Sequence, residues 1–192
     1  MKTLEEANAI RQELIMGSGE LARHFKEWTV CGSIRRLQPT VGDIDIVAIQ
    51  KPESEYQFGE YGIGGWITIL DPTGAAESAK MGKGGAARFL DGALIKRFQY
   101  KGISIDLYLA DKQTYGCLVL IRTGSKEHNI RLTKLARQKG LKLFASGKGL
   151  CQIKGGGYGY DPEVITNTVE STEDGILQNL LGRVPKPQER FN

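Results

Sequence analysis

The sequence predicts an α+β protein of two subdomains, and three observations lead to that prediction. Two segments, 43–50 and 94–110, alternate apolar and polar residues with the period of a β-strand. Two others, 3–14 and 125–139, repeat apolar residues at helical spacing. Near residue 122 the composition turns strongly basic. We therefore expect a first subdomain over 1–121 and a smaller C-terminal α/β subdomain over 122–192.

The chain is expected to begin with a helix over 3–14. Thr3 and Glu6 form the capping-box pattern that marks a helix N-terminus. The apolar face of this helix is made by Leu4, Ala7, Ile10 and Leu14. A short helical turn over 21–25 and a strand over 28–31 are predicted to follow.

Three further strands are predicted in the first subdomain, over 43–50, 94–100 and 103–110. A tight turn at Lys101-Gly102 joins the last two, because Gly readily takes the backbone conformation that such turns need. These two strands are therefore expected to form a hairpin.

The region between residues 51 and 90 carries a weak pattern. Many glycines and two prolines predict loops around one candidate strand over 66–70. The GKGG stretch at 82–85 is compatible with a phosphate contact, but a lone glycine-rich loop is weak evidence for one.

The C-terminal subdomain is predicted to contain helices and short strands. An apolar helix is expected over 113–122, and a second one begins at Ser125 as its N-cap and stops at Gly140. The remaining expected elements are strands over 141–144 and 149–153, the glycine-rich GGGYGY at 155–160, and a final helix over 172–181.

Composition excludes several classes of protein. With 192 residues, 40% hydrophobic and 25% charged, the chain is typical of a globular protein. No apolar run has transmembrane length and the N-terminus lacks a signal-peptide pattern, so we expect a soluble, intracellular protein, monomeric by default and without a membrane partner. Cys31, Cys117 and Cys151 lack zinc-ligand spacing to His24 or His128. Reduced, buried thiols and structural histidines are therefore expected.

Positive charge is concentrated in one segment. Between Arg122 and Lys154 there are nine Lys or Arg and a single acid, Glu127, so this segment carries +8 although the whole chain carries only +4. A solvated helix face usually mixes charges of both signs. The concentration therefore favours a surface that binds a polyanion.

Three aspartates are candidates for a metal site. Asp43 and Asp45 lie on one face of their strand, because side chains two residues apart point the same way. Asp106 occupies the polar face of the strand ISIDLYL. If the two strands pair, three carboxylates converge, and hard oxygen ligands suit Mg²⁺, with Mn²⁺ as an alternative. For an isolated DxD, solvation at the surface is the competing interpretation.

The residues just upstream favour the metal interpretation. Gly32 allows a phosphate to approach the backbone closely, and Ser33 offers a hydroxyl and an amide. Arg35 and Arg36 supply charge-assisted hydrogen bonds. Candidate triphosphate-binding groups thus lie about ten residues from the carboxylates. The alternative for Ser33 is an ordinary helix cap.

At this point the sequence resembles a known family. The segment CGSIRRLQPTVGDIDIV is similar to the nucleotidyltransferase signature of family X DNA polymerases, the group that contains DNA polymerase beta. Three more blocks follow in family order: ISIDLYL, RTGSKEHNIRLTKLARQKGLKL and STEDGILQNLLGRVPKPQER. The resemblance covers most of the chain except about 51–90. It implies a palm subdomain, built as a mixed sheet flanked by helices, with a thumb-like, nucleotide-selecting subdomain after it.

The resemblance also implies residue roles in the palm. Asp43, Asp45 and Asp106 would hold two Mg²⁺ ions, and Asp106 would help to activate the primer 3′-hydroxyl. The positions that match the family's triphosphate-binding turn are Gly32, Ser33, Arg36 and Gly42.

In the C-terminal subdomain the resemblance implies nucleotide and DNA contacts. Gly124 matches the backbone bend beside the nucleotide sugar, and Asn129 matches a residue at the minor-groove edge of the new base pair. The basic segment over 122–154 supplies the expected DNA-binding residues, Arg122, Lys126, Arg131 and Lys134.

Some positions depart from the family pattern. Ile121-Arg122 stands where many relatives have a Tyr-Phe pair that shapes the sugar pocket, and Thr133 stands where an Arg that touches the template side is common. Met1 lies just ahead of the palm, so the lyase activity of the family's N-terminal region is not expected from this chain.

The function that the resemblance implies is template-directed addition of deoxynucleotides to a primer, as in short gap filling during DNA repair. Gapped or primer–template DNA and deoxynucleoside triphosphates would be the partners. Two alternatives stay open: another nucleotidyltransferase, either template-independent or acting on RNA or a small molecule, and a non-catalytic DNA-binding module.

Overall fold

The computed structural model describes residues 1–17, 24–52, 90–91, 94–154 and 164–190. Several predicted features lie outside these residues: most of the helical turn over 21–25, the strand over 66–70, GKGG at 82–85 and GGGYGY at 155–160. Phe25, at the end of that predicted turn, is instead the first residue of strand β2, Phe25–Val30.

The chain divides into two compact units, Met1–Ala110 and Asp111–Asn192, called the first unit and the second unit below. The division falls earlier than the predicted one between residues 121 and 122. The reason is helix α6, Tyr115–Thr123, whose buried Cys117 and Leu120 belong to the hydrophobic core of the second unit. The basic composition that begins at Arg122 marks a surface property and not the boundary of a core.

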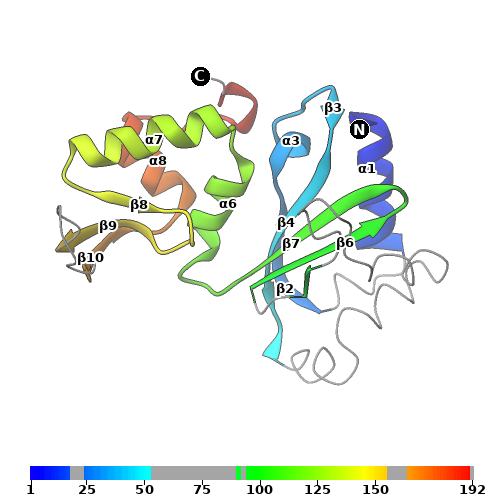
Figure 1. Ribbon diagram of the computed structural model, residues 1–192, viewed down its shortest axis with the longest axis horizontal. Coiled ribbons are helices and arrows are strands. Elements are labelled where there is room, and N and C mark those ends of the chain that lie inside the picture. The colour runs from blue at the N-terminus through cyan, green and yellow to red at the C-terminus, as the bar shows by residue number, and fades with distance from the viewer. Residues whose placement is uncertain (18–23, 53–89, 92–93, 155–163, 191–192) are drawn as a thin grey trace, which may run out of the picture. The chain divides into compact units, whose positions relative to one another are not determined.

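A five-stranded mixed sheet forms the centre of the first unit, in the order β2-β4-β7-β6-β5 (Figure 1). Its strands, besides β2, are β4 (Asp43–Gln50), β7 (Ile103–Ala110), β6 (Ile95–Tyr100) and β5 (Leu90–Asp91). The pair β4–β7 is parallel and the other pairs are antiparallel. The predicted mixed sheet and its hairpin across Lys101-Gly102 are therefore confirmed.

Helix α1, Leu4–Gln12, packs on this sheet and continues into a π-helical turn, Glu13–Gly17. Thr3 is its N-cap, and the capping box with Glu6 is present, as the sequence predicts. The core that the helix and sheet share is made by Ala7, Ile10, Leu14, Ile44, Ile46, Ile105 and Leu107, among others. A short helix, α3 (Gly32–Arg35), and a small two-stranded sheet of β1 (Lys2–Thr3) and β3 (Thr40–Val41) complete the unit.

In its described residues, the second unit combines three helices with a three-stranded antiparallel sheet of order β10-β9-β8. After α6 come α7 (Lys126–Gln138), β8 (Lys142–Phe144), β9 (Gly149–Lys154), β10 (Val164–Glu170), α8 (Glu173–Leu181) and a 3-10 turn (Pro187–Glu189). Ser125 and Thr172 cap α7 and α8 through their side chains. Strand β10 was not predicted, because most of its side chains are exposed and it lacks the apolar alternation of a half-buried strand.

The three cysteines form no disulfide and are buried, as expected. Burial is the main reason that the pKa of the Cys117 thiol is raised to about 11. Such a thiol stays protonated at neutral pH and acts as a small apolar side chain. Within the described ranges, no helix has the length and apolar character needed to cross a bilayer.

His128 gives a testable pH dependence. Its side chain is 3% exposed, and burial, followed by the charges of Arg190 and Arg131, lowers its pKa to about 4. An unfolded histidine takes up a proton near pH 6.5, so acidification between about pH 6.5 and pH 4 favours the unfolded chain. We expect the free energy of unfolding to fall by about 3 kcal/mol over this interval because of His128 alone.

The measurement is urea unfolding at several pH values for the wild type and for His128→Gln. The other titrating groups are common to both proteins, so the difference between the two pH profiles isolates His128. Parallel profiles between pH 4 and pH 6.5 would contradict the prediction.

Candidate active site

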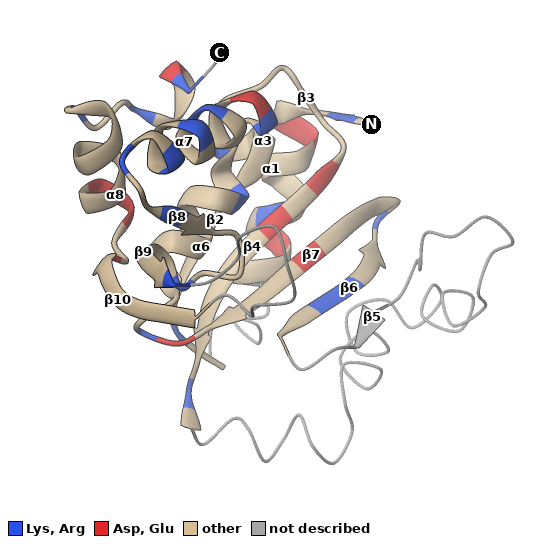
Figure 2. Cartoon of the chain, turned by 60° about the vertical axis from the view of Figure 1, so that its left-hand side comes forward, with Lys and Arg blue, Asp and Glu red and all other residues tan. Residues whose placement is uncertain are grey.

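Strand pairing brings the three predicted carboxylates onto neighbouring positions of the first unit. In the parallel pair β4–β7, Asp45 lies opposite Asp106 and Asp43 lies opposite Ser104. Because side chains alternate along a strand, all three aspartates project from the same face of the sheet. Figure 2 shows the acidic stretches of β4 and β7 near a basic stretch of β6. The predicted pairing of the two strands is confirmed.

Asp106 is buried and engaged by an arginine that the sequence reasoning missed. Its side chain is 2% exposed and accepts two hydrogen bonds from Arg97, at 2.6 Å from Nε and 2.5 Å from Nη2. The Tyr108 hydroxyl donates a third, at 3.2 Å, to Oδ2. Arg97 stands directly across the antiparallel β6–β7 ladder from Asp106. A buried carboxylate needs such a partner, since an unpaired buried charge is costly.

The pKa of the Asp43 carboxyl is shifted by its surroundings in this cluster. Partial desolvation, followed by the negative charge of Asp106, raises the pKa of Asp43 above its ordinary value. The charges of Arg97 and Arg36 act in the opposite direction and are weaker causes. The carboxylates of Asp43 and Asp106 are thus close enough to repel each other, and a cation placed between them would relieve that repulsion.

Gly32 lies against the second carboxylate of the signature. Its φ is +60°, a value that L-residues with a side chain rarely adopt, and a Cβ at this position would collide with the Asp45 carboxylate. The backbone N–H of Cys31 donates to the Asp45 carbonyl at 2.8 Å, which holds the turn beside β4. The structure therefore requires glycine at residue 32. Gly42 carries no such requirement, because a Cβ there would meet nothing within 4 Å.

Ser33 lies inside the short helix α3 and does not cap it. Cys31 is the N-cap of that helix and makes no side-chain capping bond. The Ser33 hydroxyl oxygen is buried and has no hydrogen-bond partner. Arg36 is the C-cap residue of α3, and its charge acts on Asp43. A buried hydroxyl free to donate, three residues before an arginine in the chain, suits an anionic group such as a phosphate.

The donor set fits a divalent cation, but the side chains do not stand ready to hold one. Asp43, Asp45 and Asp106 supply the hard oxygens that Mg²⁺ and Mn²⁺ take. Among the residues that the structure describes, no group of three His, Cys, Asp or Glu side chains is arranged to hold a metal ion. Asp106 is instead turned to Arg97. For all three carboxylates to hold the metal, Asp106 has to leave this pairing.

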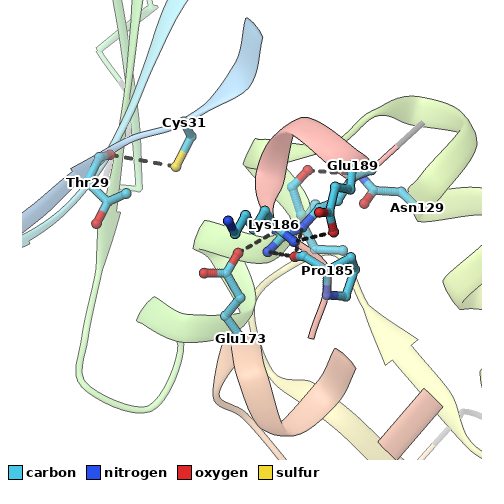
Figure 3. A network of polar contacts seen from close by, with 9 residues as sticks. Thr29, Cys31, Asn129, Glu173, Pro185, Lys186 and Glu189 are labelled. Carbon is cyan, nitrogen blue, oxygen red and sulfur yellow. Dashed lines mark hydrogen bonds and ion pairs between the residues drawn. The ribbon is translucent and has the colours of Figure 1, made fainter. Parts of the chain in front are cut away.

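The predicted residues of the second unit are placed in and beside the turn between α6 and α7. Gly124 is the C-cap of α6, with a φ of +66°. The side-chain amide of Asn129 donates to the Ile121 carbonyl at 2.8 Å, while its Oδ1 is buried without a hydrogen-bond partner (Figure 3). Asn129 therefore fastens the end of α6 to α7 in this structure, and its carbonyl oxygen remains available as an acceptor.

The predicted DNA-binding residues belong to the same helices. Lys126, Arg131 and Lys134 are exposed along α7, and Arg122 is half-buried in the last turn of α6. Figure 2 shows the basic stretches along α7. Exposed Lys and Arg side chains on one helix are compatible with contacts to a phosphate backbone.

Arg190 is a second arginine whose role the sequence reasoning missed. It is 2% exposed, donates to Glu173 at 2.6 Å, and donates twice to the Pro185 carbonyl at 3.2 Å. Its own carbonyl accepts from the Ser125 N–H at 3.5 Å. Figure 3 shows Glu173 and Pro185 converging on this network. Arg190 thus ties the C-terminal segment to α8 and to the start of α7. The PKPQER block belongs to the family resemblance, but its spacing does not identify Glu173 as the partner of Arg190.

Comparison with known proteins supports the fold. No protein-family model matches the chain, and no curated protein matches it in sequence. Among solved structures, the chain is similar to Leishmania infantum polymerase beta, whose crystal structure is a ternary P/T complex. The TM-score is 0.67 at 19% sequence identity, and the match covers 100% of this chain and 77% of the other. The predicted fold, a palm-like mixed sheet flanked by helices with a small α/β unit after it, is therefore confirmed.

Proposed function

We propose that this chain is a DNA polymerase of the family X type, which adds deoxynucleotides to a primer 3′-hydroxyl by nucleotidyl transfer and fills short gaps during DNA repair. The observation that carries the proposal is the register of β4 and β7, which places Asp45 opposite Asp106 with Asp43 beside them. The fold that the chain shares with polymerase beta supports it.

The reaction forms one bond and breaks another at the α-phosphorus of the incoming nucleotide. The primer 3′-oxygen attacks that phosphorus, its proton passes to water or to the Asp106 carboxylate, and the bond to the bridging oxygen breaks to release pyrophosphate. Mg²⁺ ions held by Asp43, Asp45 and Asp106 would lower the pKa of the 3′-hydroxyl and offset the charge of the phosphates. Mn²⁺ has the same ligand preference and would serve as an alternative.

The chain's own residues supply binding and orientation. The unpartnered Ser33 hydroxyl would donate to a triphosphate oxygen, and Arg36 would add charge beside it. Gly32 keeps the turn close to Asp45, so the phosphate-binding groups and the metal ligands share one short stretch of backbone. Asn129 and Gly124 would contact the nucleotide through the second unit.

The second unit would bind the DNA through its phosphates. Lys126, Arg131 and Lys134 are exposed on α7 and give the helix a basic surface. Contacts of this kind position a duplex without reading its sequence, as a gap-filling enzyme requires. A small-molecule acceptor would not need such a surface.

The test is primer extension on DNA with a one-nucleotide gap, in Mg²⁺, with one deoxynucleoside triphosphate offered at a time. Templated polymerisation predicts that only the nucleotide complementary to the gap is incorporated efficiently. Incorporation without regard to the template would indicate a template-independent nucleotidyltransferase. Failure to incorporate any nucleotide, in Mg²⁺ or in Mn²⁺, would overturn the proposal and leave the DNA-binding interpretation.

A further inference from the structure

One member of the carboxylate cluster, Asp106, already pairs with an arginine, Arg97. Arg97 contacts both oxygens of Asp106 in a bidentate geometry, at 2.6 Å and 2.5 Å. It reaches them from β6, the neighbouring strand of the sheet, and not from the signature segment. None of the residue roles described above uses Arg97, although it donates two hydrogen bonds to a proposed metal ligand.

We propose that Arg97 is a resident counter-ion of Asp106 which competes with divalent cations for this carboxylate, so that Asp106 joins the metal site only when Arg97 withdraws. The proposal rests on the metal site of the proposed function. It makes Arg97 a positioning residue, since its effect on the metal passes through Asp106.

The geometry sets Arg97 and a metal ion in competition for the Asp106 carboxylate. The guanidinium of Arg97 donates to both carboxylate oxygens of Asp106, so a metal ion would have to compete with it for these same two oxygens. A divalent cation in contact with the same oxygens would repel the guanidinium strongly at such short range. This agrees with the finding that no three carboxylates of the described residues are arranged to hold a metal.

Burial explains why a counter-ion is built in. Asp106 is 2% exposed, so in the absence of a cation its charge would be left uncompensated in a poorly solvated place. Asp43 adds a second negative charge nearby, as the raised pKa of its carboxyl indicates. The hydrogen bonds to Asp106 in turn raise the pKa of Arg97, which keeps the guanidinium charged at every physiological pH.

Arg97 is also placed so that it can leave. Its side chain is 37% exposed, in contrast to the buried carboxylate that it contacts. The guanidinium is therefore already partly solvated, and moving it further into water does not desolvate it. The Tyr108 hydroxyl, which donates to Oδ2 of Asp106, can hold the carboxylate in orientation while the arginine is exchanged for a metal ion.

The test is a titration of the full chain with Mn²⁺ in the absence of DNA and nucleotide, with free Mn²⁺ followed by electron paramagnetic resonance. We expect Arg97→Gln to bind Mn²⁺ about tenfold or more tightly than the wild type, because a competitor for the carboxylate has been removed. Arg97→Lys keeps the charge but loses the bidentate geometry, and its affinity should lie between the two.

Two controls assign the effect to Asp106. Lys96→Gln removes the same charge from the adjacent position of β6, which pairs with Leu107, and should leave Mn²⁺ affinity within about twofold of the wild type. In the double variant Arg97→Gln/Asp106→Asn the gain in affinity should disappear, because the group for which arginine and metal compete is absent.

Several outcomes would overturn the proposal. Unchanged or weaker Mn²⁺ binding by a folded Arg97→Gln, or by Arg97→Lys if the glutamine variant does not fold, would show that Arg97 is not a competitor. Failure of every variant to bind Mn²⁺ would do the same. Because the titration uses neither DNA nor nucleotide, it can succeed in a protein that does not polymerise. The failure of the proposed function is thereby distinguishable from the failure of this inference.

Discussion

Asp106→Asn is expected to lower nucleotide incorporation by about a thousandfold or more, which corresponds to about 4 kcal/mol in the activation free energy. The substitution keeps the shape of the side chain but removes the charge that would help to hold the metal ions. The fold should survive, because Asn can still accept from Tyr108 or Arg97, and Arg97 is 37% exposed and can be solvated. The measurement is single-turnover incorporation on one-nucleotide gapped DNA.

DNA binding by the same variant should change by no more than about threefold, because the proposed phosphate contacts lie on α7 and not on the sheet. Fluorescence anisotropy with the same DNA measures this. Asp174→Asn is the matched control: it makes the identical chemical change at an exposed residue in the first turn of α8, and it should leave incorporation unchanged. If Asp106→Asn loses DNA binding while it remains folded, the role assigned to Asp106 is wrong.

Much of the fold could be predicted because its elements depend on local signals. Thr3 and Ser125 cap their helices through patterns that are visible in the sequence, and β4 and β7 show the alternation of strands with one polar face. The elements that were missed lack such signals. Strand β10 exposes most of its side chains, and the boundary at Ala110 depends on which core receives α6, a tertiary property.

Part of the candidate site could likewise be predicted because it depends on local sequence motifs. The three aspartates and Gly32 belong to compact motifs, whereas Arg97 acts through a cross-strand register. That register could have been derived: a two-residue turn at Lys101-Gly102 pairs Tyr100 with Ile103, and counting outward pairs Arg97 with Asp106. The direction of the Arg97 side chain, and its preference for Asp106 over solvent, could not be read from the pattern.

Gly32→Ala is expected to lower incorporation by about a hundredfold, although the change adds a single methyl group. A Cβ at this residue would collide with the carboxylate of Asp45, so that side chain would have to move away from its position on β4. Displacing a reacting or metal-holding group by about 1 Å can reduce a rate by about a hundredfold. Incorporation on gapped DNA and Mn²⁺ affinity are the two measurements, and both should fall.

The matched control is Gly102→Ala, at the tip of the β6–β7 hairpin. Its φ of +73° is close to the +60° of Gly32, but a Cβ there would meet nothing within 4 Å. Both substitutions should lower the free energy of unfolding by about 1 kcal/mol, because alanine is strained at positive φ. Only Gly32→Ala should also lose incorporation and Mn²⁺ affinity, since only it displaces a proposed metal ligand. Equal losses in both variants would mean that backbone strain is the cause, and the close approach of the Gly32 turn to Asp45 would then have no catalytic role.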